Sequence, residues 1–219
     1  MNFNNNIKHK VMKVLKQIVF STLLSTVVAC NMSAQDITLP APVKTGGKPL
    51  MEVLNERKST KANYINKDLD LQTLSDLLWS AYGFNRPDKR TVPSAQNSQE
   101  FSVYVLLNDG AYLYDAKQNK LTEVAKGSFK NLLANAQQPY VNNVPMHLVY
   151  VGNLNKSKAG RDGMLIDTGF LAQNVYLFAA SKGLGTVARA SFDRKQLPVA
   201  LKLNPQQEIV LVQAVGPVE

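Results

Sequence analysis

Residues 167–193 read DTGFLAQNVYLFAASKGLGTVARASFD, and this stretch decides the fold of the chain. From 170 to 180 nearly every residue is apolar, and such a run predicts a helix buried in the protein, over about 168–182. The run is too short to span a bilayer, which needs roughly 20 apolar residues. We therefore expect this helix to be the centre of a folded domain.

The residues at the two ends of the helix carry boundary signals. Asp167 or Thr168 can cap its start, because either side-chain oxygen can accept an orphan backbone N–H. Gly183 favours the left-handed conformation that ends many helices, and Leu184 is placed for the apolar contact that accompanies it. Residues 186–192 then predict an extended segment that leaves the core.

Hydrophobic spacing and turn residues predict elements on both sides of the central helix. Asp70 is placed to cap a helix with an apolar stripe, and Asn108, Asp109 and Gly110 form a hairpin turn signal. Because one pair of strands is a hairpin, we expect an α+β fold with a mixed or antiparallel sheet flanked by helices. Helices are predicted at 49–56, 71–82 and 128–136, and strands at 101–107, 111–115, 120–124, 146–152 and 208–215.

The first 34 residues have the pattern of a signal peptide, with a lysine-rich lead before an apolar run at 18–29. Two cleavage sites remain open, one before Cys30, which would then carry a lipid, and one after Ala34. Both predict export, to the periplasm or to a membrane-anchored position in the cell envelope. Residues 35–48 are rich in proline and glycine and predict a tether or surface arm, so the domain is expected at 49–219.

Composition and charge exclude several classes of protein. The chain has 219 residues, of which 45% are hydrophobic and 19% charged, as in a folded domain. The net charge of +9 includes four leader lysines, so the 25 basic residues fall to 21 against 16 acidic ones, or +5. This modest excess, without a basic stripe, argues against nucleic-acid binding. Cys30 is the single cysteine, which excludes internal disulfides and thiolate metal sites.

The usual catalytic groupings are also missing from the sequence. His147 is the single histidine outside the leader, and it lies in a predicted strand without an acidic neighbour. That leaves no Ser-His nucleophile pair and no paired histidines for zinc. We therefore expect no metal site, and we interpret His147 as a structural residue.

Two polar segments remain as candidates for a binding site. Arg57, Lys58, Ser59 and Lys61 lie within five residues at the end of a short helix, and cations beside hydroxyl groups suit a phosphate. Taken alone, this segment is also compatible with a solvated charged loop. The second segment, 93–99, is dense in amide and hydroxyl groups and lies just before a strand.

Together with the central helix, these segments resemble the nitroreductase family of flavin mononucleotide (FMN) enzymes. RKSTKA at 57–62 is similar to the phosphate motif R-x-S-x-[KR] of that family, and PSAQNSQEF at 93–101 is similar to P-S-x-x-N-x-Q-P-W. The stretch 167–185 resembles D-x-G-x-x-x-Q-N-x-x-L-x-A-x-x-x-G-L-G. LSDLLWSAYGFNR at 74–86 is similar to a helix of the subgroup that includes peptide azoline oxidases. The four motifs stand in family order.

The resemblance implies an α+β sandwich in an obligate homodimer, with FMN bound at the interface. The implied reaction is a two-electron transfer through flavin N5 to a small-molecule acceptor. Arg57 and Ser59 would hold the phosphate and ribityl chain, and Lys61 would lie near flavin N1. The partner subunit would contribute the turn after residue 93, and a turn after the central helix would offer backbone N–H groups near N5. The full implied set is Arg57, Lys58, Ser59, Lys61, Ser94, Ala95, Asn97, Ala190 and Ser191.

Two features leave other functions open. Arg189 stands where the family usually has an apolar residue beside the flavin ring, which predicts weaker FMN binding. Export removes the chain from nicotinamide donors, so a membrane quinone or a partner protein becomes the expected electron donor. The alternatives are a cofactor-free envelope binding lipoprotein that keeps the fold, and a peptide-modifying oxidase that is supported only by the segment 74–86.

Overall fold

The computed structural model describes residues 35–219. The predicted signal peptide lies outside the described residues, and so do both cleavage sites and the lipid attachment at Cys30. Within the described part, no helix is long and apolar enough to cross a membrane.

Helices and strands alternate irregularly along the chain. The strands are β1 Ile37–Thr38, β2 Phe84–Arg86, β3 Lys89–Arg90, β4 Phe101–Leu106, β5 Gly110–Asp115, β6 Lys120–Lys126, β7 Met146–Asn153, β8 Gly185–Arg189 and β9 Gln207–Gly216. The α-helices are α2 Leu50–Glu56, α3 Leu71–Tyr82, α4 Lys130–Leu133, α5 Gly160–Lys182 and α6 Gln196–Ala200, with 3₁₀ turns η1 Ala95–Asn97 and η2 Pro139–Asn143.

Seven strands form one sheet in the order β1-β6-β5-β4-β7-β9-β8, while β2 and β3 form a separate hairpin. Every paired neighbour in the large sheet is antiparallel. The predicted hairpin is confirmed, because β4 and β5 pair with Leu106 opposite Ala111. The α+β fold class predicted from the sequence is therefore confirmed, and its sheet is antiparallel.

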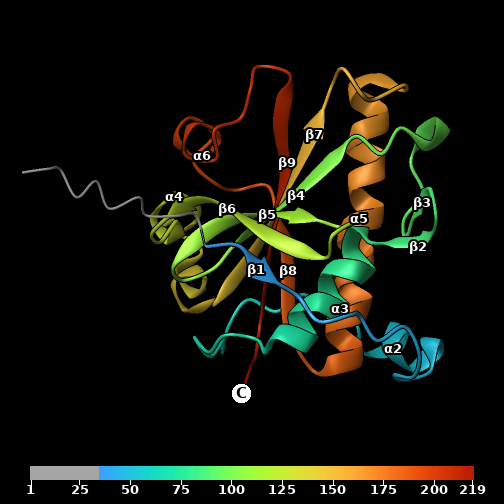
Figure 1. The fold of residues 1–219 in the computed structure, drawn as a ribbon. Helices are drawn as coiled ribbons and strands as arrows, with labels where there is room; N and C mark the ends of the chain where they lie inside the picture. Colours follow the sequence, from blue (N-terminus) through green and yellow to red (C-terminus); the bar gives the residue numbers. More distant parts are fainter. Residues whose placement is uncertain (1–34) are drawn as a thin grey trace, which may run out of the picture. The chain divides into compact units, whose positions relative to one another are not determined.

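The sheet has an apolar core on each of its two faces. Along β4, Val103 and Val105 belong to the cluster that packs under α3 and α5, while Tyr104 and Leu106 belong to the cluster that packs with α4 and α6. This alternation follows from the strand geometry, in which successive side chains point to opposite faces. The result is a three-layer arrangement, with α3 and α5 side by side on one face of the sheet (Figure 1).

The central helix α5 ends as predicted but begins earlier than predicted. Gly183 ends it with a φ of 68°, in the left-handed conformation. Its start is Gly160, eight residues before the predicted 168, so neither Asp167 nor Thr168 caps it. Thr168 instead donates its hydroxyl to the carbonyl of Met164 at 2.7 Å, inside the helix.

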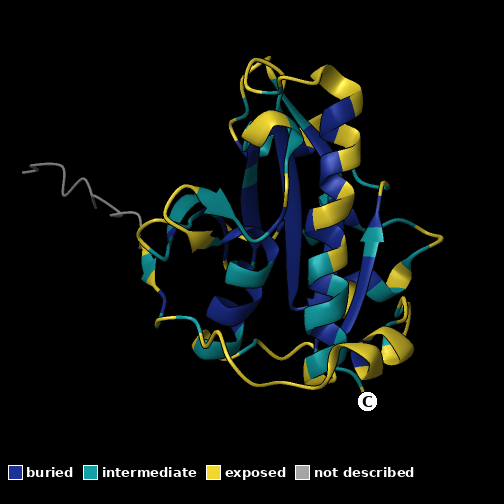
Figure 2. Ribbon diagram, turned by 90° about the vertical axis from the view of Figure 1, so that its right-hand side faces the viewer, coloured by how far each residue is buried: buried dark blue, intermediate teal, exposed yellow. Residues whose placement is uncertain are grey.

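One side of α5 is buried and the other is exposed, which corrects the prediction of a helix without a solvated side. Leu171 and Val175 are fully buried against the sheet. Leu165, Ile166 and Phe170 are exposed, and Ile166 keeps 64% of its surface accessible. Buried and exposed residues alternate along the helix in Figure 2. Of these exposed residues, Phe170 belongs to the predicted run 170–180, whereas Leu165 and Ile166 lie in the earlier part of α5 that was not predicted as helical.

The segment after the leader is a surface arm attached to the domain. Ile37 pairs with Leu121 of β6, and Leu39 is buried. Further along, the backbone N–H of Val43 donates to Asp76 Oδ1 at 2.8 Å. Ile37, Leu39 and Val43 of this segment thus contact the domain surface.

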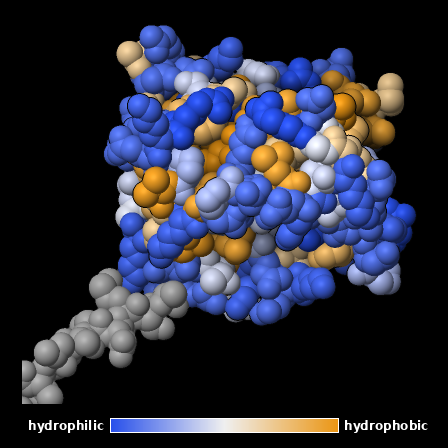
Figure 3. Space-filling view, turned by 90° about the horizontal axis from the view of Figure 1, so that it is seen from above, coloured by the Kyte–Doolittle hydropathy of each residue, from blue (hydrophilic) through white to orange (hydrophobic). Residues whose placement is uncertain are grey.

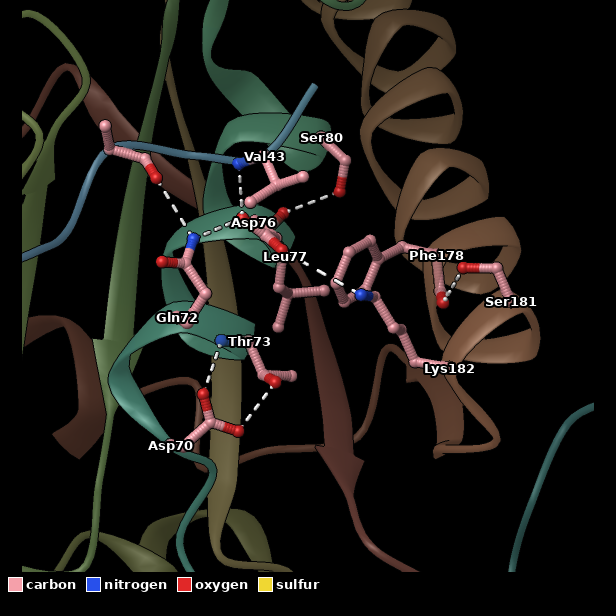
Figure 4. A network of polar contacts seen from close by, with 11 residues as sticks. Val43, Asp70, Gln72, Thr73, Asp76, Leu77, Ser80, Phe178, Ser181 and Lys182 are labelled. Carbon is pink, nitrogen blue, oxygen red and sulfur yellow. Dashed lines mark hydrogen bonds and ion pairs between the residues drawn. The ribbon is translucent and has the colours of Figure 1, made fainter. Parts of the chain in front are cut away.

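Asp76 joins the arm to two helices. Besides Val43, its Oδ1 accepts a 2.8 Å hydrogen bond from the side chain of Gln72 on the same helix. Its Oδ2 lies 3.9 Å from the ammonium of Lys182, at the end of α5. Figure 4 shows these contacts converging on one carboxylate. Asp76 is only 5% exposed, so its charge depends on these partners.

His147 lies inside β7 and is buried, as expected for a structural residue. Burial lowers its pKa to about 3, and the positive charges of Arg189 and Lys130 act in the same direction. The imidazole is therefore neutral at ordinary pH. Its Nε2 has no hydrogen-bond partner among the described residues.

We expect Asp76→Ala to lower the free energy of unfolding by about 1–3 kcal/mol, because it removes the acceptor of the Val43 N–H and one of the two acceptors of the Gln72 amide, which also donates to the Ala41 carbonyl. The ion pair adds little, since Lys182 is half-exposed. Asp88→Ala is the matched control, and this exposed carboxylate should change the free energy by less than about 0.5 kcal/mol. Equal effects of the two substitutions in urea denaturation would contradict the role given to Asp76.

We expect His147 to make the protein less stable in mild acid. Its pKa is lower in the folded chain than in the unfolded one, so below about pH 6.5 the unfolded chain binds a proton that the folded chain does not. Between about pH 6.5 and pH 5, the wild type should lose about 1.5 kcal/mol more unfolding free energy than His147→Leu. Urea denaturation at several pH values measures this difference, and parallel curves for the two chains would refute it.

Candidate functional site

The cation segment, residues 57–61, follows α2 and runs along the edge strand β8. The backbone N–H of Thr60 donates to the carbonyl of Thr186 at 2.9 Å, which fixes the segment beside the strand. Gly185 permits this approach, because a Cβ there would lie 3.1 Å from Cγ2 of Thr60 and 2.4 Å from Cγ1 of Val218. The short Gly-Leu-Gly sequence after α5 is thus explained by close packing of the cation segment.

The Tyr176 hydroxyl connects the cation segment to the end of β8. It lies 2.9 Å from the hydroxyl of Ser59, and it accepts the backbone N–H of Ala188 at 2.9 Å. The guanidinium of Arg57 lies 5.3 Å from the centre of the Tyr176 ring. Sequence reasoning missed Tyr176, because it occupies a variable position of the helix motif and carries no signal of its own.

The cations of this segment are available for an anionic ligand. Within residues 35–219, no acidic group lies within ion-pair distance of Arg57, Lys58 or Lys61. Lys58, Ser59 and Lys61 are exposed, and Arg57 is half-buried. A cavity of about 340 Å³ lies against the segment and touches its residues Lys58 and Thr60. Tyr176 and Glu56 also line this cavity, and the Glu56 carboxylate is paired with Lys48 at 2.6 Å.

The second predicted segment forms a tight turn against the first half of α5. The backbone N–H of Ala95 donates to Asp167 Oδ2 at 2.9 Å. The N–H of Asn97 donates to the carbonyl of Ser94 at 2.9 Å, which closes the turn. Asp167, which was predicted as a helix cap, instead fixes this turn. The turn lies near the α5 start, since a Cβ on Gly163 would be 3.9 Å from the Cβ of Ala95. Seen from above the view of Figure 1, the molecule has small apolar groups separated by polar ones (Figure 3).

Within one protomer the two predicted segments lie at different levels of α5. Asp167 and Tyr176 are nine residues apart, which is about 13.5 Å along a helix at 1.5 Å per residue. No hydrogen bond or ion pair among the described residues joins the cation segment to the turn of Ser94, Ala95 and Asn97. Their assignment to two different subunits stays a prediction.

The third predicted segment follows β8 directly. Ala190 is exposed and Ser191 half-buried, and neither backbone N–H has an acceptor within the described part of the chain. The hydroxyl of Ser191 accepts a 2.5 Å hydrogen bond from the side-chain amide of Asn135. The Tyr176 hydroxyl contacts both the Ser59 hydroxyl and the N–H of Ala188, which lies two residues before Ala190. This turn and the cation segment therefore lie in one region of the chain.

Arg189 points into the protein and ties this turn to the segment after α4. Its Nη2 donates to the carbonyl of Leu133 at 2.6 Å and to that of Ser191 at 2.9 Å, and its Nε donates to Gln138 at 2.7 Å. The residue is 4% exposed. Its side chain therefore does not cover Ala190, whose carbonyl instead accepts a 3.1 Å hydrogen bond from the guanidinium of Arg194.

The donor set of this region fits a flavin phosphate. Cations without acidic partners and the Ser59 hydroxyl suit a phosphate, and the free N–H groups of Ala190 and Ser191 suit acceptor atoms of a flavin ring. In the same part of the chain, no group of three or more His, Cys, Asp or Glu side chains is close enough to hold a metal ion.

Comparison with known proteins identifies the family. The model of the nitroreductase family matches residues 54–217. The chain is 31% identical to a protein of Methanocaldococcus jannaschii described as a nitroreductase, over 71% of this chain and 85% of that protein. It is 35% identical to a solved structure from Ralstonia eutropha JMP134, also described as a nitroreductase, with a TM-score of 0.76 over 86% of this chain and 91% of that one.

A more distant structure extends the likeness of the fold. A protein of Desulfovibrio desulfuricans, solved in complex with FMN, is 16% identical and has a TM-score of 0.60, over 79% of this chain and 88% of that one. At this identity the likeness concerns the fold alone. From the family model and the two closer relatives we conclude that the chain belongs to the nitroreductase family.

Proposed function

We propose that this nitroreductase-family oxidoreductase depends on FMN and transfers two electrons to a small-molecule acceptor. The observation that carries the proposal is the position of the Tyr176 hydroxyl between Ser59 and the N–H of Ala188. The Tyr176 hydroxyl thus links the cation segment, whose cations have no acidic partner, to the turn of Ala190 and Ser191, whose backbone N–H groups have no acceptor among the described residues. A phosphate and a flavin ring need these two kinds of group at opposite ends of one ligand.

Each part of the region has a role in the proposal. Arg57 and Ser59 bind the phosphate, while Lys61 supplies positive charge near flavin N1. The N–H groups of Ala190 and Ser191 hold the edge of the ring near N5. FMN, when bound, supplies the two-electron chemistry, and positive charge near N1 favours its reduced form. The protein then needs to bind and orient the cofactor, and no side-chain acid or base is required.

We also propose that the protein works as a homodimer. The exposed apolar residues Leu165, Ile166 and Phe170 follow one another along α5, and Leu50 and Met51 of α2 are exposed as well. Exposed apolar groups of this size often mark an interface between subunits. A second copy that covers them would add its own Ser94, Ala95 and Asn97 to the site.

The signal-peptide pattern of the first 34 residues supports a proposal about where the protein works and what donates its electrons. We propose export to the cell envelope, with a lipid on Cys30 as one route to membrane attachment. A membrane quinone or a partner protein then supplies the electrons, because nicotinamide donors belong to the cell interior. We propose a small molecule as the electron acceptor, without assigning a particular compound.

The phosphate role of Arg57 can be separated from the ring contacts by comparing FMN with riboflavin, which lacks the phosphate. We expect Arg57→Ala to weaken FMN binding about 10- to 150-fold, since a charge-assisted contact is worth about 1.5–3 kcal/mol. Riboflavin binding should not change. Flavin fluorescence titration of the purified chain measures both affinities.

Arg86→Ala is the control, because it removes an exposed arginine from the β2–β3 hairpin. It should leave both affinities unchanged. A wild-type chain that binds neither flavin would refute the proposal and favour the cofactor-free binding protein.

The dimeric site predicts complementation between two inactive variants. Arg57→Ala and Asn97→Ala should each bind FMN weakly as homodimers. A mixed dimer of the two has one site with both residues intact, so co-expression should restore one tightly bound FMN per mixed dimer. Differently tagged chains allow its isolation, and absorption gives the flavin content. No recovery would show that Arg57 and Asn97 act in the same protomer or not at all.

A further inference from the structure

Glu100 is a buried carboxyl group without a visible partner. The residue is 1% exposed and stands immediately before β4, where its carbonyl accepts the N–H of Asn153 at 3.1 Å. Neither of its carboxyl oxygens has a hydrogen-bond partner among the described residues, and no cation there lies within ion-pair distance. A bare carboxylate in such a position is strongly disfavoured, because burial removes its hydration without replacement.

The neighbour of Glu100 is a second buried carboxyl group. Asp167 of α5 is 4% exposed, and its Oδ2 holds the N–H of Ala95. Burial raises the pKa of Glu100, its own backbone amide acts in the opposite direction, and the nearby Asp167 carboxyl group raises it. Two ionised carboxylates can only accept hydrogen bonds, so neither can donate one to the other. A hydrogen bond between Glu100 and Asp167 therefore requires a proton on one of the two carboxyl groups.

The other groups around the pair do not replace that proton. Tyr82 of α3 accepts the N–H of Phe101 at 3.2 Å, and burial raises its pKa to about 12, so it stays neutral. Arg90 of β3 stacks on the Tyr82 ring at 4.3 Å and donates to Gln99 and to the Tyr82 carbonyl. The charges of Glu100 and Asp167 both act on Tyr82, and Arg90 contacts the ring and the carbonyl of Tyr82.

The carboxyl pair lies under a strained turn. Gln96, Asn97 and Gln99 have φ values of 52°, 55° and 48°, in the left-handed region that side chains disfavour. Asp167 fixes the beginning of the turn through Ala95, and the Glu100 carbonyl fixes its end by accepting the N–H of Asn153. A turn of this kind persists when its surroundings hold it at both ends.

We propose that Glu100 and Asp167 share one proton, and that this proton keeps the turn of Ser94, Ala95 and Asn97 in its binding conformation. Loss of the proton puts two negative charges side by side in a buried space, and the turn is released. The first half of the proposal concerns the protein alone. The second half rests on the proposed function, since it treats the turn as a flavin contact.

The sign of the pH dependence follows from the raised pKa. The folded chain keeps a proton that the unfolded chain has lost above about pH 4.5, so Glu100 stabilises the fold most in acid and this contribution is lost as the pH rises. Glu100→Gln keeps a hydrogen-bond donor toward Asp167 and cannot titrate. Between about pH 5 and pH 9, the unfolding constant of the wild type should rise at least about tenfold relative to that of Glu100→Gln.

Glu208→Gln is the matched control. Glu208 pairs with Arg161, and this hydrogen bond lowers its pKa, so the control should follow the wild type over the same range. Carbon-13 NMR of the glutamate carboxyl groups then tests the proton directly in the wild type. The Glu100 signal, assigned by its absence in Glu100→Gln, should titrate above about pH 4.5. A signal that titrates at or below that value would overturn the proposal even if Glu100→Gln does not fold.

Flavin binding tests the second half separately. The affinity of the wild type for FMN should be at least about tenfold lower when Glu100 is deprotonated than when it is protonated. The affinity of Glu100→Gln for FMN should not change over the same pH range. Equal affinities for both forms would overturn the control of the turn by the proton. Absence of FMN binding in every chain at every pH would overturn the proposed function instead, while the NMR titration would still decide whether the proton is shared.

Discussion

The burial of one side of α5 against the antiparallel sheet fixes the positions of all the segments of the candidate site. Leu171 and Val175 anchor the helix without exposed surface, so its polar groups are held at fixed points. Asp167 then holds the turn before β4, and Tyr176 holds the cation segment and the end of β8. A shift of the helix by one turn would displace these contacts together.

Local signals were enough to predict most elements of the fold. Asp70 caps α3 by accepting the N–H of Thr73 at 2.9 Å, and Gly183 ends α5, both as expected from residue type alone. The beginning of α5 was missed because it depends on distant parts of the chain. Its first turns contain Met164, which is fully buried in the core and lies directly against Gly152 of β7. A glycine-containing polar stretch has no local reason to be helical without such a partner.

The exposed side of α5 shows a second limit of sequence reasoning. A run of apolar residues indicates burial, but it does not distinguish a core from a surface that a second subunit covers. In the candidate site, the positions of Arg57, Ser59 and the turn after β8 came from motifs. Tyr176, Glu100 and the role of Asp167 came from tertiary contacts, which depend on residues more than 60 positions apart.

The contact between Thr60 and Thr186 has a consequence for how this fold evolves. β8 is the last strand of the sheet, and an uncovered strand edge invites pairing with other chains. The cation segment shields that edge through Thr60, and the Tyr176 hydroxyl occupies the N–H of Ala188. Selection against aggregation would thus preserve the path of the backbone at residue 60, where any residue except proline supplies the N–H, even in a descendant that no longer used flavin. Such a descendant would lose Arg57 and Ser59 first, while its backbone kept the same course.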